Sequence, residues 1–182
     1  QDTFARRNRN AELGRALVLV DIAPKTNPVG VDRILSFMKS GLAGFASLDE
    51  AASAVADYTR ELRRAPTTDG LRKNLRQRAD GRWYWHWDPR FVDGTRNPAK
   101  RPNGLLEEMV ARLPVPTLLI RGSKSDVLTD EGVDAFRRAV PHAQHVDVAG
   151  AGHMVAGDRN DAFTDAILVF LRHFRRETEP RT

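Results

Sequence analysis

The chain of 182 residues contains no cysteine. This absence excludes disulfide bonds, thiol nucleophiles, and zinc or iron–sulfur sites held by cysteine. The sequence also lacks an apolar run of the ~20 residues that a membrane-spanning helix needs, and it shows no basic-then-apolar secretory leader. We therefore expect a cytoplasmic protein that does not contact a membrane.

The sequence patterns that hold metals and phosphate-bearing cofactors are missing as well. The five histidines form no H-E-x-x-H or similar frame. The glycine-rich segment at residues 150–152 lacks the third glycine of a dinucleotide-binding loop and does not lead directly into a predicted helix. We expect neither a metal nor a cofactor.

The chain has only a small excess of positive charge. The 29 Lys and Arg residues exceed the 24 Asp and Glu residues by five, and basic and acidic residues are interspersed along the chain. A nucleic-acid-binding protein would gather its basic residues on one face or stripe, so we interpret these charges as solvated helix faces and expect no nucleic-acid partner. With 41% hydrophobic and 29% charged residues, the composition is that of one globular domain, or one domain with a subdomain.

Three short apolar runs, at residues 16–20, 115–121 and 145–148, indicate strands. Uninterrupted apolar runs of this length are typical of strands buried on both faces, as in a parallel sheet. Helical patterns follow the second and third runs, and strands that alternate with helices predict an α/β fold with a parallel sheet.

Helical periodicity fills most of residues 29–113, between the first and second predicted strands. We therefore predict a core built from residues 1–24 and 114–182, and a helical subdomain at residues 25–113.

Two helix starts are predicted inside this subdomain. Ser47 and Glu50 have the spacing of a capping box, in which each side chain satisfies a free backbone N–H group at the start of a helix. Asp69 is expected to cap a later helix that carries Leu71 and Leu75 on one side.

Polar residues occupy two predicted loops, at residues 122–126 and 150–153, each of which directly follows a strand. In α/β proteins, sites lie just beyond the carboxyl ends of the strands. Asp126 in the first loop and His153 in the second are therefore expected to form a pair, in which the carboxylate orients the imidazole and the imidazole acts as a general base.

At these residues the chain resembles the C-terminal part of the α/β-hydrolase family. The resemblance rests on residues 116–122, 125–126 and 152–154, and residues 17–24 are similar to the family's sixth strand and the entry to its cap. It covers about residues 15–175. It implies a partial α/β-hydrolase fold, the last three strands of a parallel sheet with flanking helices, with the helical insertion as the cap subdomain.

The resemblance also implies roles for particular residues. His153 matches the family's catalytic histidine, and Asp126 matches the acid after the seventh strand. Asp21 is an alternative acid, because some relatives place the acid at the end of the preceding strand. The loop context favours Asp126.

The family's nucleophile has no counterpart in this sequence. It occupies a G-x-S-x-G turn, or the same turn with Asp, ahead of the sixth strand. None of the serines of this chain has that frame, namely Ser36, Ser40, Ser47, Ser53, Ser123 and Ser125. We therefore expect the N-terminal half of the fold, or self-association, to complete the sheet, and we expect the chain to be inactive by itself.

Aromatic residues of the insertion are expected to line an apolar substrate pocket, as the cap does in the family. The predicted substrate-contacting residues are Trp83, Tyr84, Trp85, Trp87, Phe37, Met38 and Met154. Tyr58 or Tyr84 would suit an epoxide oxygen if the nucleophile were Asp.

The sequence thus predicts a hydrolase that acts on a small apolar ester through a nucleophile–Asp–His triad, or on an epoxide or related compound. The alternative is a catalytically inactive protein that binds a small molecule.

Overall fold

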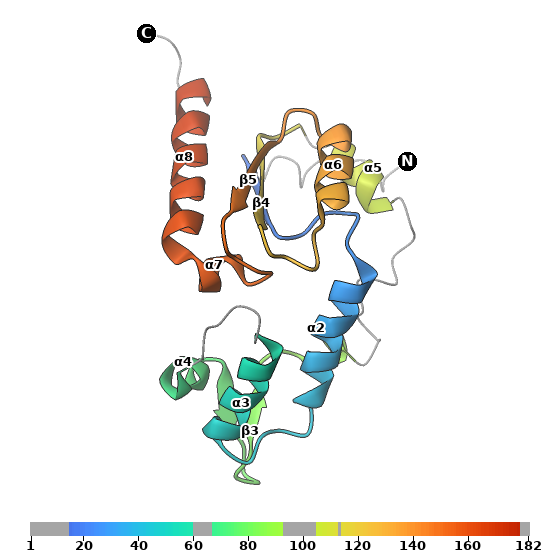
Figure 1. The fold of residues 1–182 in the computed structure, drawn as a ribbon. Helices are drawn as coiled ribbons and strands as arrows, with labels where there is room; N and C mark the ends of the chain where they lie inside the picture. The colour runs from blue at the N-terminus through green and yellow to red at the C-terminus, as the bar shows by residue number, and fades with distance from the viewer. Residues whose placement is uncertain (1–14, 60–66, 93–104, 113, 179–182) are drawn as a thin grey trace, which may run out of the picture. The chain divides into compact units, whose positions relative to one another are not determined.

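The structure is a computed structural model that describes residues 15–59, 67–92, 105–112 and 114–178 (Figure 1). Along the chain the elements are β1 (Leu17–Val20), α2 (Pro28–Ser40), α3 (Leu48–Tyr58), α4 (Thr68–Arg72), β2 (Leu75–Gln77), β3 (Trp83–Trp85), η2 (Pro89–Phe91), α5 (Leu105–Ala111), β4 (Thr117–Gly122), α6 (Asp130–Ala139), β5 (Gln144–Val148), α7 (Val155–Asp158) and α8 (Asn160–Thr178). The chain divides into two compact units. One contains Gln1–Val29 and Pro102–Thr182, and the other contains Gly30–Arg101.

The first unit holds a three-stranded parallel sheet in the order β1-β4-β5. Leu17 pairs with Thr117, and Leu118 pairs with Gln144. The predicted α/β fold class is therefore confirmed. Because all three strands run the same way, their carboxyl ends lie together at one edge of the sheet, where α/β proteins place their sites.

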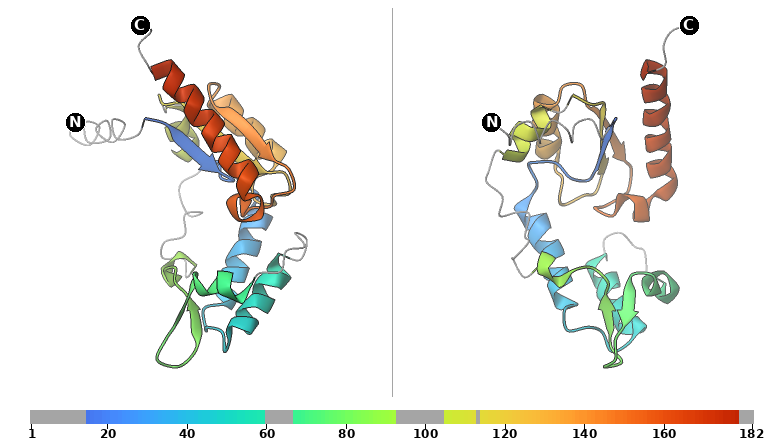
Figure 2. Two further views of the ribbon diagram at one scale, coloured as in Figure 1. Left: turned by 90° about the vertical axis from the view of Figure 1, so that its left-hand side faces the viewer. Right: turned by 180° about the vertical axis from the view of Figure 1, so that it is seen from behind.

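Helices cover both faces of this sheet, with α6 on one side and α8 on the other (Figures 1 and 2). Successive side chains of β4 point to opposite faces. Leu119 packs into a core with Phe136 of α6, whereas Ile120 packs into a second core with Phe170 of α8. Burial on both faces explains why β4 has an apolar run rather than an alternating pattern.

The second unit has its own small core. Ser47 is the N-cap of α3, where its Oγ accepts a hydrogen bond from Glu50 N at 3.1 Å. The Glu50 carboxylate accepts a hydrogen bond from Ala46 N. The Ser47 half of the predicted capping box is thus confirmed, whereas Glu50 reaches the N–H of Ala46, one residue before the N-cap.

The helix predicted to carry Leu75 is shorter than expected. Thr67, and not Asp69, is the N-cap of α4, which ends at Arg72. Leu75 lies in β2, where it pairs with Trp85 of β3 in an antiparallel ladder. The prediction was wrong because pairing with a strand ten residues later outweighs the local helical spacing.

Within the described ranges, no helix is both long and apolar enough to cross a membrane.

Candidate active site

Asp21 directly follows β1 at the carboxyl edge of the sheet. Its backbone N–H donates to Ile120 O at 2.7 Å, and its side chain is fully buried. Its φ angle is +50°, in the left-handed region that few residues other than glycine adopt. This turn is where the chain leaves the strand. Such an uncommon backbone at a buried carboxylate is typical of a functional position.

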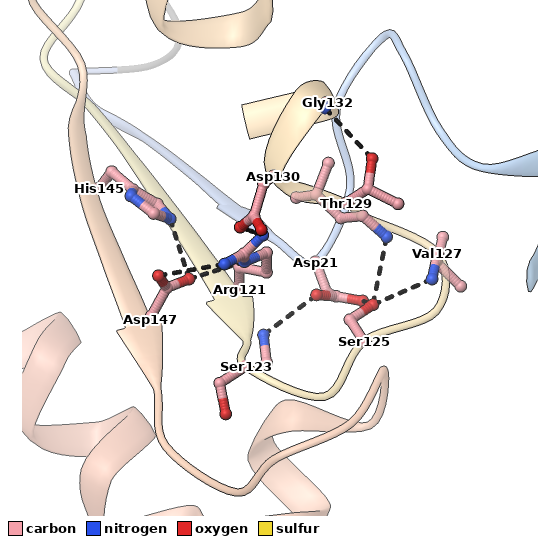
Figure 3. A network of polar contacts seen from close by, with 12 residues as sticks. Asp21, Arg121, Ser123, Ser125, Val127, Thr129, Asp130, Gly132, His145 and Asp147 are labelled. Carbon is pink, nitrogen blue, oxygen red and sulfur yellow. Dashed lines mark hydrogen bonds and ion pairs between the residues drawn. The ribbon is translucent and has the colours of Figure 1, made fainter. Parts of the chain in front are cut away.

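The Asp21 carboxylate accepts three hydrogen bonds. Gly122 N donates to Oδ1 at 3.1 Å, while Ser125 Oγ and His153 Nδ1 reach Oδ2 at 2.5 Å and 2.8 Å. Figure 3 shows Asp21 between the loop that follows β4 and the end of that strand. A buried charge is costly unless it is hydrogen-bonded, and these three donors supply that stabilisation for the ionised form.

His153 presents its other ring nitrogen away from the carboxylate. Because an ionised carboxylate only accepts hydrogen bonds, Nδ1 carries the hydrogen and the neutral ring has its lone pair at Nε2. About a third of the side chain is exposed (32%). Among the residues that the structure describes, none hydrogen-bonds Nε2, so this atom is available to accept a proton.

Hydrogen bonds on three consecutive residues hold the loop that carries His153. Gly150, at φ +75°, donates its N–H to Ser123 Oγ at 2.9 Å. Ala151 O accepts from Lys124 N at 2.8 Å, and Gly152 N donates to Asp158 Oδ2 at 2.9 Å. The loop after β4 and the loop after β5 are therefore joined.

Gly122 permits this close approach. A Cβ atom at Gly122 would lie 2.1 Å from Gly152 O and 2.6 Å from Ala151 O, well inside contact distance. Both obstacles are backbone atoms, which cannot turn aside as a side chain can. Glycine at this position lets the histidine loop pack against the end of β4.

The acid that reaches His153 differs from the one that loop context favoured. The hydrogen bond of His153 Nδ1 goes to Asp21, the alternative acid. Asp126 accepts a hydrogen bond at its backbone oxygen from Asn27 Nδ2 at 2.9 Å. The sequence signal for Asp21 was an acid directly after a buried apolar run. Nothing local marked Ser125 or Asp158 as a partner of the site.

An ion-pair network lies beside this site (Figure 3). Arg121 bonds Asp147 Oδ1 through Nε at 2.7 Å and Asp130 Oδ1 through a terminal nitrogen at 2.5 Å. Its hydrogen bond to Asp147, opposed by partial burial, raises the pKa of the guanidinium above its usual value. His145 Nε2 lies 3.2 Å from Asp147 Oδ1 without hydrogen-bond geometry. The network ties β4, β5 and the start of α6 together next to Asp21.

Most of the predicted substrate-contacting residues lie in the second unit. Phe37 stacks on Tyr58 with ring centroids 4.4 Å apart, and it meets Trp85 edge-on. Trp83 and Trp85 pack against the core of Phe45, Ala51, Leu71 and Leu75. Met38 and Trp87 are half-buried.

Two of these residues have different surroundings. The Tyr84 hydroxyl donates to Asp80 at 2.7 Å, which raises the pKa of the phenol. Met154, in the first unit beside His153, is exposed. Substrate contact by the whole set stays a prediction.

In the described residues, no cluster of three or more histidine, aspartate or glutamate side chains could hold a metal ion.

Curated proteins that resemble the chain include a hydrolase and a decarboxylase. The chain is 28% identical over 158 residues to the 3-hydroxybutyrate-oligomer hydrolase of Cupriavidus necator, covering 76% of this chain and 50% of the relative. It is 33% identical over 95 residues to the cis-3-alkyl-4-alkyloxetan-2-one decarboxylase of Shewanella oneidensis, covering 50% and 29%. The chain thus spans half or less of these curated relatives. No protein-family model matches it.

Solved structures that superpose on the chain include a hydrolase and an esterase. The crystal structure of E-2-(acetamidomethylene)succinate hydrolase superposes with a TM-score of 0.73 at 18% identity, over 87% of this chain and 57% of that protein. An esterase of Mycobacterium tuberculosis superposes with a TM-score of 0.60 at 25% identity, over 86% and 52%.

Proposed function

This chain has the α/β-hydrolase fold, over little more than half the length of the solved hydrolases that it matches, and from that premise we propose that it carries the acid and the base of an ester hydrolase. The base is His153 and the acid is Asp21. The observation that supports this most directly is the 2.8 Å hydrogen bond between His153 Nδ1 and the fully buried Asp21 carboxylate. An acid–imidazole pair with the second ring nitrogen available is what nucleophilic hydrolysis requires.

The proposed reaction uses Nε2 as the proton acceptor. His153 removes the proton of a nucleophile as that group attacks the ester carbonyl carbon, and it returns the proton to the leaving alcohol oxygen when the C–O bond breaks. Water then enters by the same route and releases the acid. Asp21 stays ionised throughout, holds the ring in the correct tautomer and stabilises the imidazolium.

The nucleophile comes from outside this sequence in our proposal. Ser123 and Ser125, in the loop after β4, make other hydrogen bonds. Ser125 Oγ donates to Asp21, and Ser123 Oγ accepts from Gly150 N. Neither hydroxyl has a hydrogen bond to His153 in the structure. We infer that a segment of the same protein, or a second chain, presents a serine to Nε2.

Esters of 3-hydroxy acids are the proposed first substrates to test. The names of both curated relatives describe such compounds. An oligomer of 3-hydroxybutyrate is a linear ester of a 3-hydroxy acid, and an oxetan-2-one is the cyclic ester. A substrate of this kind offers an ester carbonyl for attack and a nearby alkyl chain for apolar contacts.

The test is ester turnover by the protein that carries this chain together with its nucleophile, measured with 4-nitrophenyl butyrate and 4-nitrophenyl 3-hydroxybutyrate. We expect His153→Ala and Asp21→Asn each to lower kcat by roughly 10³-fold or more, as for other triads. Asp126→Asn, the matched control in the neighbouring loop, should change kcat by less than about threefold, because the carboxylate that the His153 ring hydrogen-bonds is that of Asp21.

The same variants decide between the acids and between enzyme and binding protein. A large loss in Asp126→Asn with little loss in Asp21→Asn would assign the acid to Asp126. Wild-type protein that binds the ester by calorimetry but never turns it over would support the inactive binding protein instead.

A further inference from the structure

The Ser125 hydroxyl occupies a central position in the site, although the sequence predicted no role of its own for it there. We propose that Ser125 is a positioning residue that holds the Asp21 carboxylate for His153. The inference rests on the proposed function, since it concerns how the acid of that pair is oriented. Ser125 acts through Asp21 and does not touch the reacting atoms.

The direction of the Ser125 hydrogen bond is fixed by its surroundings. Ser125 Oγ accepts from Val127 N at 3.1 Å and from Leu128 N at 3.2 Å. Two N–H donors use both lone pairs of the hydroxyl oxygen, so its single hydrogen points elsewhere. The remaining partner is Asp21 Oδ2 at 2.5 Å, which can only accept. The hydroxyl therefore donates to the acid.

Two fixed donors, one on each oxygen, set the plane of the carboxylate. Gly122 N holds Oδ1, and Ser125 Oγ holds Oδ2. His153 Nδ1 then meets Oδ2 at 2.8 Å as a further donor on the same oxygen. Because Asp21 is fully buried, protein groups provide the hydrogen bonds that water would otherwise supply. Without Ser125, the described hydrogen bonds that oppose rotation about the Cβ–Cγ bond would be those from Gly122 and His153.

The same hydroxyl also organises the loop after β4. By accepting from Val127 N and Leu128 N it closes the turn that leads to α6. Leu128 is buried in the core against Phe136. Ser125 thus links the Asp21 carboxylate to the backbone of Leu128, which is anchored in the core. Supporting hydrogen bonds of this kind hold catalytic groups in position.

The experiment compares four variants of the protein that carries this chain with its nucleophile. Ser125→Ala removes the hydroxyl, and Ser125→Thr keeps it. Ser53→Ala is the control for the loss of a serine hydroxyl, since Ser53 is exposed in α3, outside the unit that holds Asp21 and His153. Asp21→Asn breaks the pair itself. The readouts are kcat and KM on the ester, and the ¹⁵N chemical shifts of the His153 ring, which report whether Nδ1 or Nε2 carries the hydrogen.

We expect Ser125→Ala to lower kcat roughly 10- to 100-fold with KM nearly unchanged, because a misplacement of about 1 Å in a reacting group costs up to about 100-fold. Its ring shifts should move from the Nδ1–H tautomer toward a mixture of the two. Ser125→Thr should restore both readouts at least in part. Ser53→Ala should leave both near the wild-type values.

Two failures are distinguishable. If Asp21→Asn leaves the tautomer and kcat unchanged, the acid–base pair itself is refuted, and the proposed function fails with it. If Asp21→Asn alters both while Ser125→Ala alters neither, the pair stands and the role of Ser125 is overturned. A loss of kcat in Ser125→Ala with an unchanged tautomer also overturns the positioning role, because the loss would then come from elsewhere in the loop.

Discussion

At the scale of single residues, the site depends on one buried carboxylate and on the space left beside it. The Asp21 carboxylate accepts hydrogen bonds from Gly122 N at a strand end, from the Ser125 hydroxyl and from His153 Nδ1. These three groups converge because Gly122 has no side chain. Its N–H donates to Asp21 while its Cα faces the backbone of the histidine loop. The same glycine therefore provides a hydrogen bond and a close contact.

We predict that Gly122→Ala destabilises the fold by roughly 3 kcal/mol or more, at the upper end of overpacking costs, because the new Cβ would lie 2.1 Å from Gly152 O. Urea denaturation followed by circular dichroism measures the change. Gly157→Ala in α7 is the control, since its Cβ would meet only ordinary contacts. It should stay within about 1 kcal/mol of wild type. Equal effects in the two variants would contradict the close packing at Gly122.

At the scale of elements, helix ends are stabilised by local side chains. Ser47, Thr67 and Thr129 each accept a backbone N–H from three residues later, at the starts of α3, α4 and α6. In α3 the first turn also carries Asp49 and Glu50, whose negative charges interact favourably with the positive end of the helix dipole. These short-range interactions made the start of α3 predictable, whereas the cap of α4 lies two residues before the predicted Asp69.

We predict that Ser47→Ala lowers the free energy of unfolding by about 1 kcal/mol, because Glu50 N loses its acceptor. Ser53→Ala is the matched control, as Ser53 is exposed in the interior of the same helix. It should be neutral or stabilising by up to about 0.5 kcal/mol, since alanine is the better helix former. Thermal denaturation of both variants decides the matter. A loss no larger than in Ser53→Ala would show that the cap does not stabilise α3.

At the scale of the whole molecule, apolar surface remains on the first unit. In the described chain β1 pairs only with β4, and all four of its apolar residues are only half-buried. The helix α8 also exposes large apolar residues, Leu168, Val169 and Leu171. A strand edge with free N–H and C=O groups favours pairing with another chain or segment. The expectation that more of the fold, or a second copy, covers this surface stays a prediction.

We predict that residues 1–182 expressed alone self-associate in a concentration-dependent manner, because the outer edge of β1 and the exposed residues of α8 gain by being covered. Light scattering after size-exclusion chromatography, over a range of protein concentrations, measures the mass. Supplying the segment that completes the sheet should reduce the association. A monodisperse monomer that melts cooperatively would refute the prediction.

Features that depend on near neighbours in the chain could be predicted from the residue pattern. Apolar runs predicted the three parallel strands, spacing predicted the Ser47 cap of α3, and the resemblance of residues 116–122, 125–126 and 152–154 to the α/β-hydrolase family implied that fold. The same local reasoning failed at Leu75, where pairing with Trp85 converts an expected helical position into a strand.

Which carboxylate hydrogen-bonds the His153 ring depends on how distant segments of the chain pack together. Asp21 and His153 are 132 residues apart, and the loop context in the sequence favoured Asp126, at the end of the adjacent strand, over Asp21. The choice depends on the left-handed turn at Asp21, the donor from Ser125 and the contact that Gly122 allows. These are distances between segments remote in the chain, and local residue preferences do not determine them.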